Sequence, residues 1–131
     1  MTGDEVLRGR ITDRNGPYLA AWLDARGLSV DAVTVIGDRH ADIRTRVAGA
    51  VQRGVDLICV SGGLGPTHDD VTMEAVAQAA GRSLRVDPRA LEMVAARSAG
   101  LSGGPANARR TRHKQAAMPE GAVVLEPPGT A

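Results

Sequence analysis

Residues 61–72 place three glycines and two adjacent aspartates within one short stretch of the chain. The order is Ser61-Gly62-Gly63-Leu64-Gly65-Pro66-Thr67-His68-Asp69-Asp70-Val71-Thr72. Glycines let backbone N–H groups come close to an anion, and a helix that follows adds partial positive charge at its N-terminus. Two neighbouring carboxylates could hold a divalent cation that bridges phosphate oxygens. The stretch therefore predicts a phosphate site built from the amides of Gly62, Gly63 and Gly65.

Other interpretations of this stretch stay open. The loop lacks the Gly-Lys-Ser/Thr of a Walker motif and the spacing of the dinucleotide fingerprint, and a glycine-rich turn can be purely structural. Acidic residues at a helix start stabilise the helix by roughly 0.3–1 kcal/mol each without any ligand. Yet two adjacent carboxylates repel each other, and one would suffice as a cap. We therefore expect Asp70, and after it Asp69, to bind a metal ion or the substrate.

Apolar periodicity predicts alternating helices and strands around this loop. Expected helices lie after Pro17 up to Gly27 and over 41–52, 72–80, 87–98 and 107–117, and expected strands over 28–36, 56–61 and 122–125, with a short extended piece at 83–86 and a link at 100–106. We expect Thr72 or Asp69 to cap the helix over 72–80. The alternation is typical of an α/β fold with a mostly parallel sheet, and the apolar segment 56–61 is expected at a central, buried position.

Asp38 follows the end of the strand expected over 28–36. Ligands of open α/β sheets bind at the carboxyl ends of the strands, so Asp38 and the glycine loop are expected at the same edge. There Asp38 would bind a metal ion or orient a water molecule, with an N-cap of the next helix as its alternative role.

Composition narrows the function classes. The 131 residues form one domain, 43% hydrophobic but only 2% aromatic, with a net charge of +1. Few aromatic residues and a small net charge argue against nucleic-acid binding. The basic run 109–114 is interpreted as a solvated helix face, with a ligand clamp as the alternative.

Cys59 is the single cysteine of the chain and lies inside an apolar run. We expect it to be a buried, inert thiol in a protein of the reducing cytoplasm. No signal peptide and no apolar run of membrane-spanning length is found, so a membrane location is not expected.

Several motifs in order along the chain resemble the competence/damage-inducible protein A (CinA) family. They are 2–11, 13–20, Gly37-Asp38, the long 61–72 motif, Lys114-Gln115-Ala116, 119–122 and Gly129-Thr130-Ala131. The resemblance covers essentially the whole chain, and the long central motif is the specific part. It implies the molybdopterin-binding domain of the MoaB/MogA type, a three-layer α/β/α fold.

The resemblance also implies a function, a nucleotide- or pterin-phosphate site. It assigns catalysis to Asp38 and Asp70, metal binding to Asp70 and Asp69, and phosphate binding to Gly62, Gly63, Gly65, Thr67 and Asn15. Mg²⁺ or another divalent cation is the expected cofactor, and a homo-oligomer is expected. The implied reaction is metal-dependent hydrolysis of a nucleotide pyrophosphate such as ADP-ribose. The alternatives are a molybdopterin-binding or adenylyl-transfer module and a non-catalytic, truncated paralogue.

The sequence departs from the family pattern in three places. Family members have a hydrophobic strand ahead of the segment that matches Thr2-Gly3, and Asp4 stands where Thr is usual. The strand and helices that follow the segment matching Ala131 are also missing from the sequence. Deamidase chemistry, which belongs to a separate C-terminal domain of the family, is not expected of residues 1–131. We therefore expect an incomplete domain of low autonomous stability, because a lost central strand leaves unpaired backbone and apolar surface.

Overall fold

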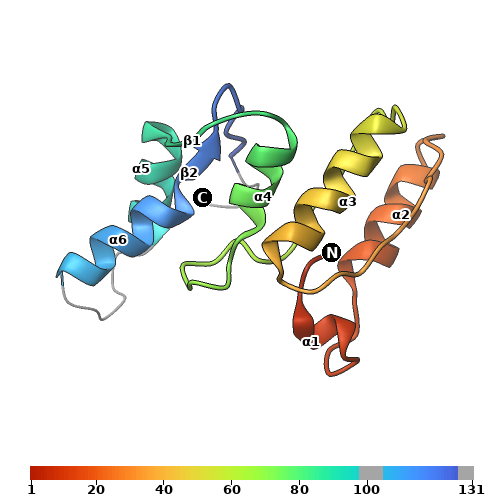
Figure 1. The fold of residues 1–131 in the computed structure, drawn as a ribbon, viewed down its shortest axis with the longest axis horizontal. Coiled ribbons are helices and arrows are strands. Elements are labelled where there is room, and N and C mark those ends of the chain that lie inside the picture. Colours follow the sequence, from red (N-terminus) through yellow and green to blue (C-terminus); the bar gives the residue numbers. More distant parts are fainter. Residues whose placement is uncertain (98–104, 127–131) are drawn as a thin grey trace.

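The computed structural model describes residues 1–97 and 105–126 and contains short helices joined by long extended segments (Figure 1). The elements are α1 (Asp4–Leu7), α2 (Asn15–Asp24), α3 (His40–Gln52), α4 (Thr72–Ala79), β1 (Leu84–Val86), α5 (Pro88–Arg97), α6 (Pro105–Gln115) and β2 (Ala117–Pro119). None of the helices in the described ranges is long and apolar enough to cross a membrane.

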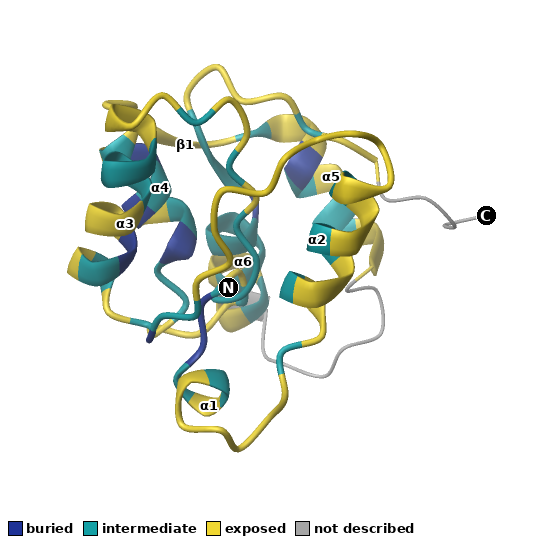
Figure 2. Cartoon of the chain, turned by 90° about the vertical axis from the view of Figure 1, so that its right-hand side faces the viewer, coloured by how far each residue is buried: buried dark blue, intermediate teal, exposed yellow. Residues whose placement is uncertain are grey.

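The helices form outer layers around the extended segments. Figure 2 shows α3 and α4 on one side and α2 on the other, with extended chain between them. The helices expected over 41–52 and 72–80 and after Pro17 are confirmed as α3, α4 and α2. The helix expected from 87 is confirmed as α5, and the one expected over 107–117 begins earlier and ends at Gln115. The link expected at 100–106 lies mostly outside the described residues. The arrangement is that of an α/β protein.

The prediction of regular strands over 28–36 and 56–61 is wrong for these residues. In each segment, only the last residues are bonded to a distant part of the chain. These bonds are the parallel bridge between Thr2 and Ile36 and the hydrogen bond from the Thr2 amide to the Ser61 carbonyl. Within the described ranges, residues 29–33 and 56–60 make no backbone bond to a neighbouring segment. Without a partner along their length, these segments are not buried, and Leu57 is 57% exposed.

The C-terminal part also differs from the prediction. The extended piece expected at 83–86 is confirmed as β1, but its partner is β2 and not the strand expected over 122–125, which does not form. β1 and β2 pair in antiparallel order, with Leu84 opposite Pro119 and Val86 opposite Ala117. Val123 and Leu125 are about four-fifths exposed, at 80% and 81%. A segment this exposed has no layer to pack against, so its apolar residues do not order it as a strand.

Small side chains make up the core of the described residues. The buried apolar residues are Ile43, Ala75, Ala77, Ala90 and Ala116. α3 packs against α4, and the opposite side of α4 meets β1 and β2 (Figure 1). Alanines let helix backbones approach closely, so α4 is held at the centre of the molecule by the elements on both of its sides.

Cys59 is exposed, which corrects the expectation of a buried thiol. The cause is the same as for Leu57, because the segment 56–60 has no neighbouring strand to cover it. We therefore predict that a thiol reagent modifies Cys59 in the native chain about as fast as in the urea-unfolded chain. The test is the rate of reaction with Ellman's reagent with and without urea. Modification that occurs only after unfolding would show that the thiol is covered.

Candidate functional site

Thr2 and Gly3 bring three distant parts of the chain together. The Thr2 amide donates to the Ser61 carbonyl oxygen at 2.8 Å, and the Gly3 amide donates to the Ile36 carbonyl oxygen at 3.0 Å. The hydroxyl oxygens of Thr2 and Thr72 lie 3.1 Å apart in a buried hydrogen bond. The ends of the segments 28–36 and 56–61 and the start of α4 therefore lie side by side, around the first residues of the chain.

Two consecutive glycines follow Ser61 in a left-handed backbone conformation. Gly62 has a φ of 97° and Gly63 a φ of 60°, which residues with a side chain rarely adopt. A Cβ on Gly62 would collide with the Thr2 carbonyl oxygen, and a Cβ on Gly63 with the Thr72 hydroxyl. Within the described part of the chain, neither glycine amide donates a hydrogen bond. Successive free amides in such a turn form a concave site for an anion.

A cleft of about 550 Å³ opens beside Gly62. Its lining includes Asn15 and Gly62, two residues assigned to phosphate binding from the sequence, together with Ser61 and Arg14. The Asn15 amide nitrogen Nδ2 donates to the Ser61 hydroxyl at 2.9 Å. Asp13 fixes the start of α2, because its Oδ1 accepts the Asn15 and Gly16 amides at 2.9 and 3.1 Å. A polar contact thus joins the two chain segments, at the start of α2 and at Ser61, that line the cleft.

Arg14 is a cation of this cleft that sequence reasoning missed. It is exposed and makes no ion pair within the described ranges. Arg14 directly precedes Asn15, which was expected to bind phosphate, and this position in the sequence could have identified it.

The far end of the loop is organised by Asp70. Its Oδ2 accepts the Thr67 amide at 2.9 Å and the Thr67 hydroxyl at 2.5 Å. Burial acts to raise the pKa of Asp70, but the hydrogen bonds from Thr67 and the Gly65 amide, with the charge of Lys114, outweigh it and hold the pKa below its ordinary value. The Gly65 amide, expected to bind phosphate, is therefore engaged by Asp70, as is the Thr67 hydroxyl. Gly65, Thr67 and Asp70 do not line the cleft.

Asp69 lies next to Asp70 on the surface. The hydrogen bond from the Thr67 side chain, followed by that from its own backbone amide, lowers the pKa of Asp69. The His68 Nδ1 lies 4.0 Å from Asp69 Oδ1. Both carboxylates of the pair are thus ionised at neutral pH.

Neither Thr72 nor Asp69 caps α4, which corrects the expected cap. The Thr72 hydroxyl is used by Thr2, and the residue at the N-cap position is Val71. The hydrogen bonds that hold this end of α4 come from the loop, since the Thr72 amide donates to the Gly63 carbonyl oxygen at 3.3 Å.

Asp38 forms a reciprocal contact with Asp4. Asp38 Oδ2 accepts the Asp4 amide at 2.9 Å, and Asp4 Oδ1 accepts the Asp38 amide at 3.3 Å. The alternative role of Asp38 as a side-chain cap of α3 is not observed. In the described ranges, the hydrogen bonds of the Asp38 side chain and amide connect it to Asp4 and not to Asp70. Sequence reasoning missed Asp4, although it noted that residue as a departure from the family pattern.

The acidic residues suit a cation only in part. In residues 1–97 and 105–126, no group of three or more His, Cys, Asp or Glu side chains is arranged to hold a metal ion. Asp69 and Asp70 do offer two ionised carboxylates, and Mg²⁺ is often held by one or two carboxylates together with substrate phosphates and water. These residues therefore fit a cation whose ligands come partly from a bound phosphate, and not a cation whose ligands all come from the protein.

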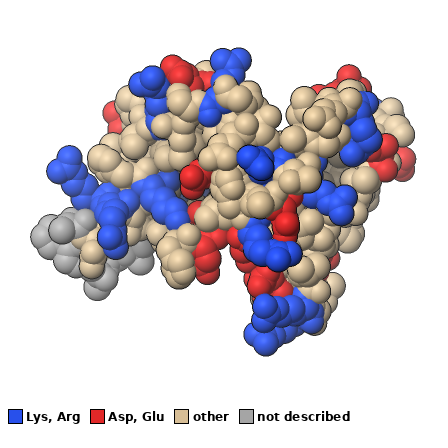
Figure 3. Space-filling model, in the orientation of Figure 1, with Lys and Arg blue, Asp and Glu red and all other residues tan. Residues whose placement is uncertain are grey.

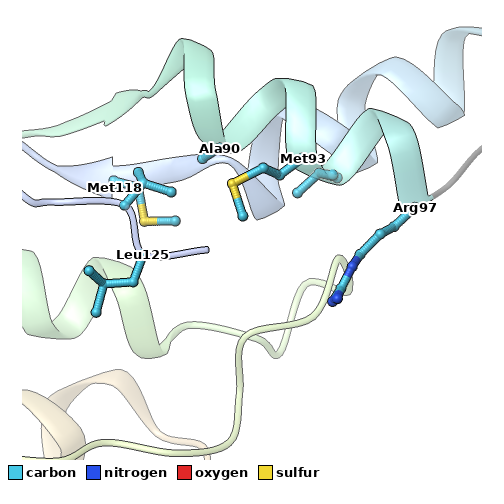
Figure 4. A pocket seen from close by; sticks show the side chains of 7 residues that line it. Ala90, Met93, Arg97, Met118 and Leu125 are labelled. Atoms are coloured by element: carbon cyan, nitrogen blue, oxygen red, sulfur yellow. The ribbon is translucent and has the colours of Figure 1, made fainter. Parts of the chain in front are cut away.

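A second hollow lies away from this loop. It has a volume of about 180 Å³ between α5 and the chain that follows β2. Figure 4 shows Met93, Met118 and Leu125 in it, with Arg97 pointing away from them. Apart from Arg97, its lining side chains are apolar and offer no group for phosphate chemistry.

We predict that Gly62→Ala destabilises the fold by about 3 kcal/mol, because the new Cβ adds a collision with Thr2 to the cost of the left-handed backbone. Gly9→Ala is the matched control, since Gly9 has a φ of 69° with open space around it. That control should cost only about 1 kcal/mol. Urea unfolding of both variants gives the comparison, and equal losses would contradict the tight contact at Gly62.

The lowered pKa of Asp70 makes part of the stability depend on pH. Above its ordinary pKa of 3.8 the carboxylate is ionised in the folded and the unfolded chain, and its hydrogen bonds are intact. As the pH falls through 3.8 towards the lower folded pKa, the unfolded chain takes up its proton first, so this contribution is lost. We predict a shallower loss of stability between pH 5 and about pH 2 for Asp70→Asn than for the wild type.

The free energy of unfolding measured across this range tests the effect. Asp24→Asn is the control, because Asp24 is exposed and its side chain forms no ion pair in the described ranges. If the free energy of unfolding falls with decreasing pH as steeply in Asp70→Asn as in the wild type, the Thr67 contact does not hold the loop.

Comparison with known proteins shows the family to which the chain belongs. The family model described as "Probable molybdopterin binding domain" matches residues 1–126. A CinA-like protein of Mycolicibacterium gilvum is 46% identical over 136 aligned residues, and one of Mycobacterium tuberculosis is 44% identical over 139. Each alignment covers all of this chain, and the chain spans 32% of the length of each relative.

Two solved structures share the fold. The protein CinA of Thermoplasma acidophilum, described as of unknown function, has a TM-score of 0.82 and 34% identity, over 99% of this chain and 74% of that one. A structure of MogA has a TM-score of 0.56 and 30% identity, over 85% and 69%. The α/β fold of the MoaB/MogA type is thereby confirmed. The chain belongs to the family of probable molybdopterin-binding domains, in the form present in CinA-like proteins.

Proposed function

We propose that the Gly62–Asp70 loop binds the phosphate of a nucleotide diphosphate or a pterin, and that the domain hydrolyses the pyrophosphate of a nucleotide such as ADP-ribose. The main supporting observation is that, in the described residues, the amides of Gly62 and Gly63 donate no hydrogen bond, and that Gly62 lines the 550 Å³ cleft. A cleft of this size fits a small-molecule ligand. The amides supply donors for phosphate oxygens at the edge where Asn15 and Arg14 also lie.

A divalent cation fits at the other end of the loop. Asp69 and Asp70 would hold it, and when bound it neutralises charge on the phosphate oxygens as the bond breaks. Asp38 keeps one oxygen, Oδ1, without a hydrogen bond in the described ranges, and this oxygen would orient the attacking water. The water oxygen bonds to one phosphorus, and the bond from that phosphorus to the bridging oxygen breaks. AMP and ribose 5-phosphate form, and the two protons of the water pass to solvent or to the product phosphates.

A binding module without turnover is the second candidate. The observation in its favour is that the described residues hold no cluster of three metal-ligating side chains, and that one oxygen of Asp38 is occupied by the Asp4 amide. A pterin phosphate needs only the amides and the cleft. Tight binding of molybdopterin with no hydrolysis of any dinucleotide would favour this candidate.

The hydrolysis is tested by AMP release from ADP-ribose in the presence of Mg²⁺. We predict that Asp70→Ala lowers the rate by about two orders of magnitude, because it removes both a carboxylate of the cation site and the anchor of the loop. Asp24→Ala, which also removes one exposed carboxylate, should retain the wild-type rate. Equal rates for wild type and Asp70→Ala would refute a role of Asp70 in hydrolysis, and chelation of Mg²⁺ should abolish AMP release.

A further inference from the structure

A lysine from a distant helix contacts the loop. The Lys114 ammonium, at the end of α6, donates to the carbonyl oxygen of Thr67, a residue 47 positions earlier in the chain. The same Thr67 donates its amide and hydroxyl to Asp70. Thr67 therefore lies between a fixed cation and a fixed anion. Only one of the three N–H groups of the ammonium is used in this contact.

We propose that Lys114 is a phosphate-binding residue, whose ammonium holds the anionic group of the ligand at the Thr67–Asp70 end of the loop. The proposal rests on the phosphate site proposed above and adds a residue and its ligand class. The basic run 109–114 then contains a ligand clamp at one position and not a uniformly solvated face.

The charge of the loop favours a cation near the bound phosphate. Asp69 and Asp70 are neighbouring acidic residues, and two adjacent negative charges repel a phosphate that approaches them. A positive charge close by offsets this repulsion, and Lys114 is placed there by its contact with Thr67, the residue that donates to Asp70. A lysine suits the task, because its ammonium is a compact point charge that binds phosphate at sites of varied geometry.

The contact with Thr67 sets Lys114 apart from neighbouring basic residues. Figure 3 shows Lys and Arg side chains gathered over α6 on this face of the molecule. Arg109 is exposed and has no contact with the loop in the described ranges, and it lies on a different face of the same helix. It carries the same charge, so Arg109→Met is a matched control for Lys114→Met.

The experiment is calorimetric titration of the chain with inorganic pyrophosphate at low salt, with and without Mg²⁺. We expect Lys114→Met to weaken binding about tenfold, as for the loss of one charged hydrogen bond. Lys114→Arg keeps the charge and should stay within about threefold of the wild type. Arg109→Met should bind like the wild type. Thermal melts establish that each variant is folded. If Lys114→Met does not fold, the affinity of Lys114→Arg for pyrophosphate still tests the proposal.

The outcomes separate this proposal from the proposed function. Wild-type affinity in Lys114→Met would overturn the role of Lys114 while leaving the phosphate site in place. Equal weakening by Lys114→Arg or by Arg109→Met would also overturn it, because the effect would then not come from a local charge. A wild type that binds no pyrophosphate would sink both. A wild type that binds pyrophosphate in a Lys114-dependent way, yet releases no AMP from ADP-ribose, would refute only the hydrolysis.

Discussion

Thr2 satisfies polar groups from two parts of the chain that are about 60 and 70 residues away. Its amide holds the Ser61 carbonyl, and its hydroxyl meets that of Thr72 in a buried position where no water competes. A donor or acceptor left unpaired there would cost about 1–3 kcal/mol. The turn at Gly62 and Gly63 lies between these two contacts, so its shape follows from them. The free amides of the proposed phosphate site thus depend on a threonine outside the glycine motif.

The loop joins two environments that differ in chemistry. At the Gly62 end, Gly62 lines a cleft together with Asn15, Arg14 and two acidic residues, Glu5 and Asp13. An anion there would be held by neutral N–H donors and the Arg14 cation. At the Asp70 end, side chains have used the loop's own donors, and the free groups are charged. A ligand with one phosphate could occupy either end, whereas a diphosphate has charges to place at both. The division supports a ligand that extends along the loop.

Much of the α/β fold could be predicted from the sequence because glycines in the sequence mark where its helices end. Gly27, Gly54 and Gly81 follow the ends of α2, α3 and α4 as expected from the sequence. The extended segments were less predictable, since a strand forms only beside a partner and apolar periodicity does not report whether the partner is present. The same reason explains why β1 pairs with β2 and not with 122–125.

Site residues were foreseeable where one motif holds them, and unforeseeable where a distant contact decides their role. The glycines and both aspartates of the loop lie within ten residues of Ser61. The partner of Thr72 is Thr2, that of Asp38 is Asp4, and that of Thr67 is Lys114, and no local pattern connects these pairs. The caps expected from Thr72 and Asp38 do not form, and the side chains of these residues are bonded to Thr2 and Asp4 in a distant part of the chain.

The alanine-rich interior limits where this domain could acquire a new ligand preference. Ala75 and Ala77 are almost completely buried on α4, so a larger residue there would push the helix, and with it Thr72, away from the loop. The start of α2 is different, because Arg14 and Asn15 are exposed and border the cleft. Substitutions there change the cleft wall without disturbing the interior. Diversification of ligand choice, in nature or by engineering, should therefore be concentrated at the beginning of α2, while α4 stays nearly invariant.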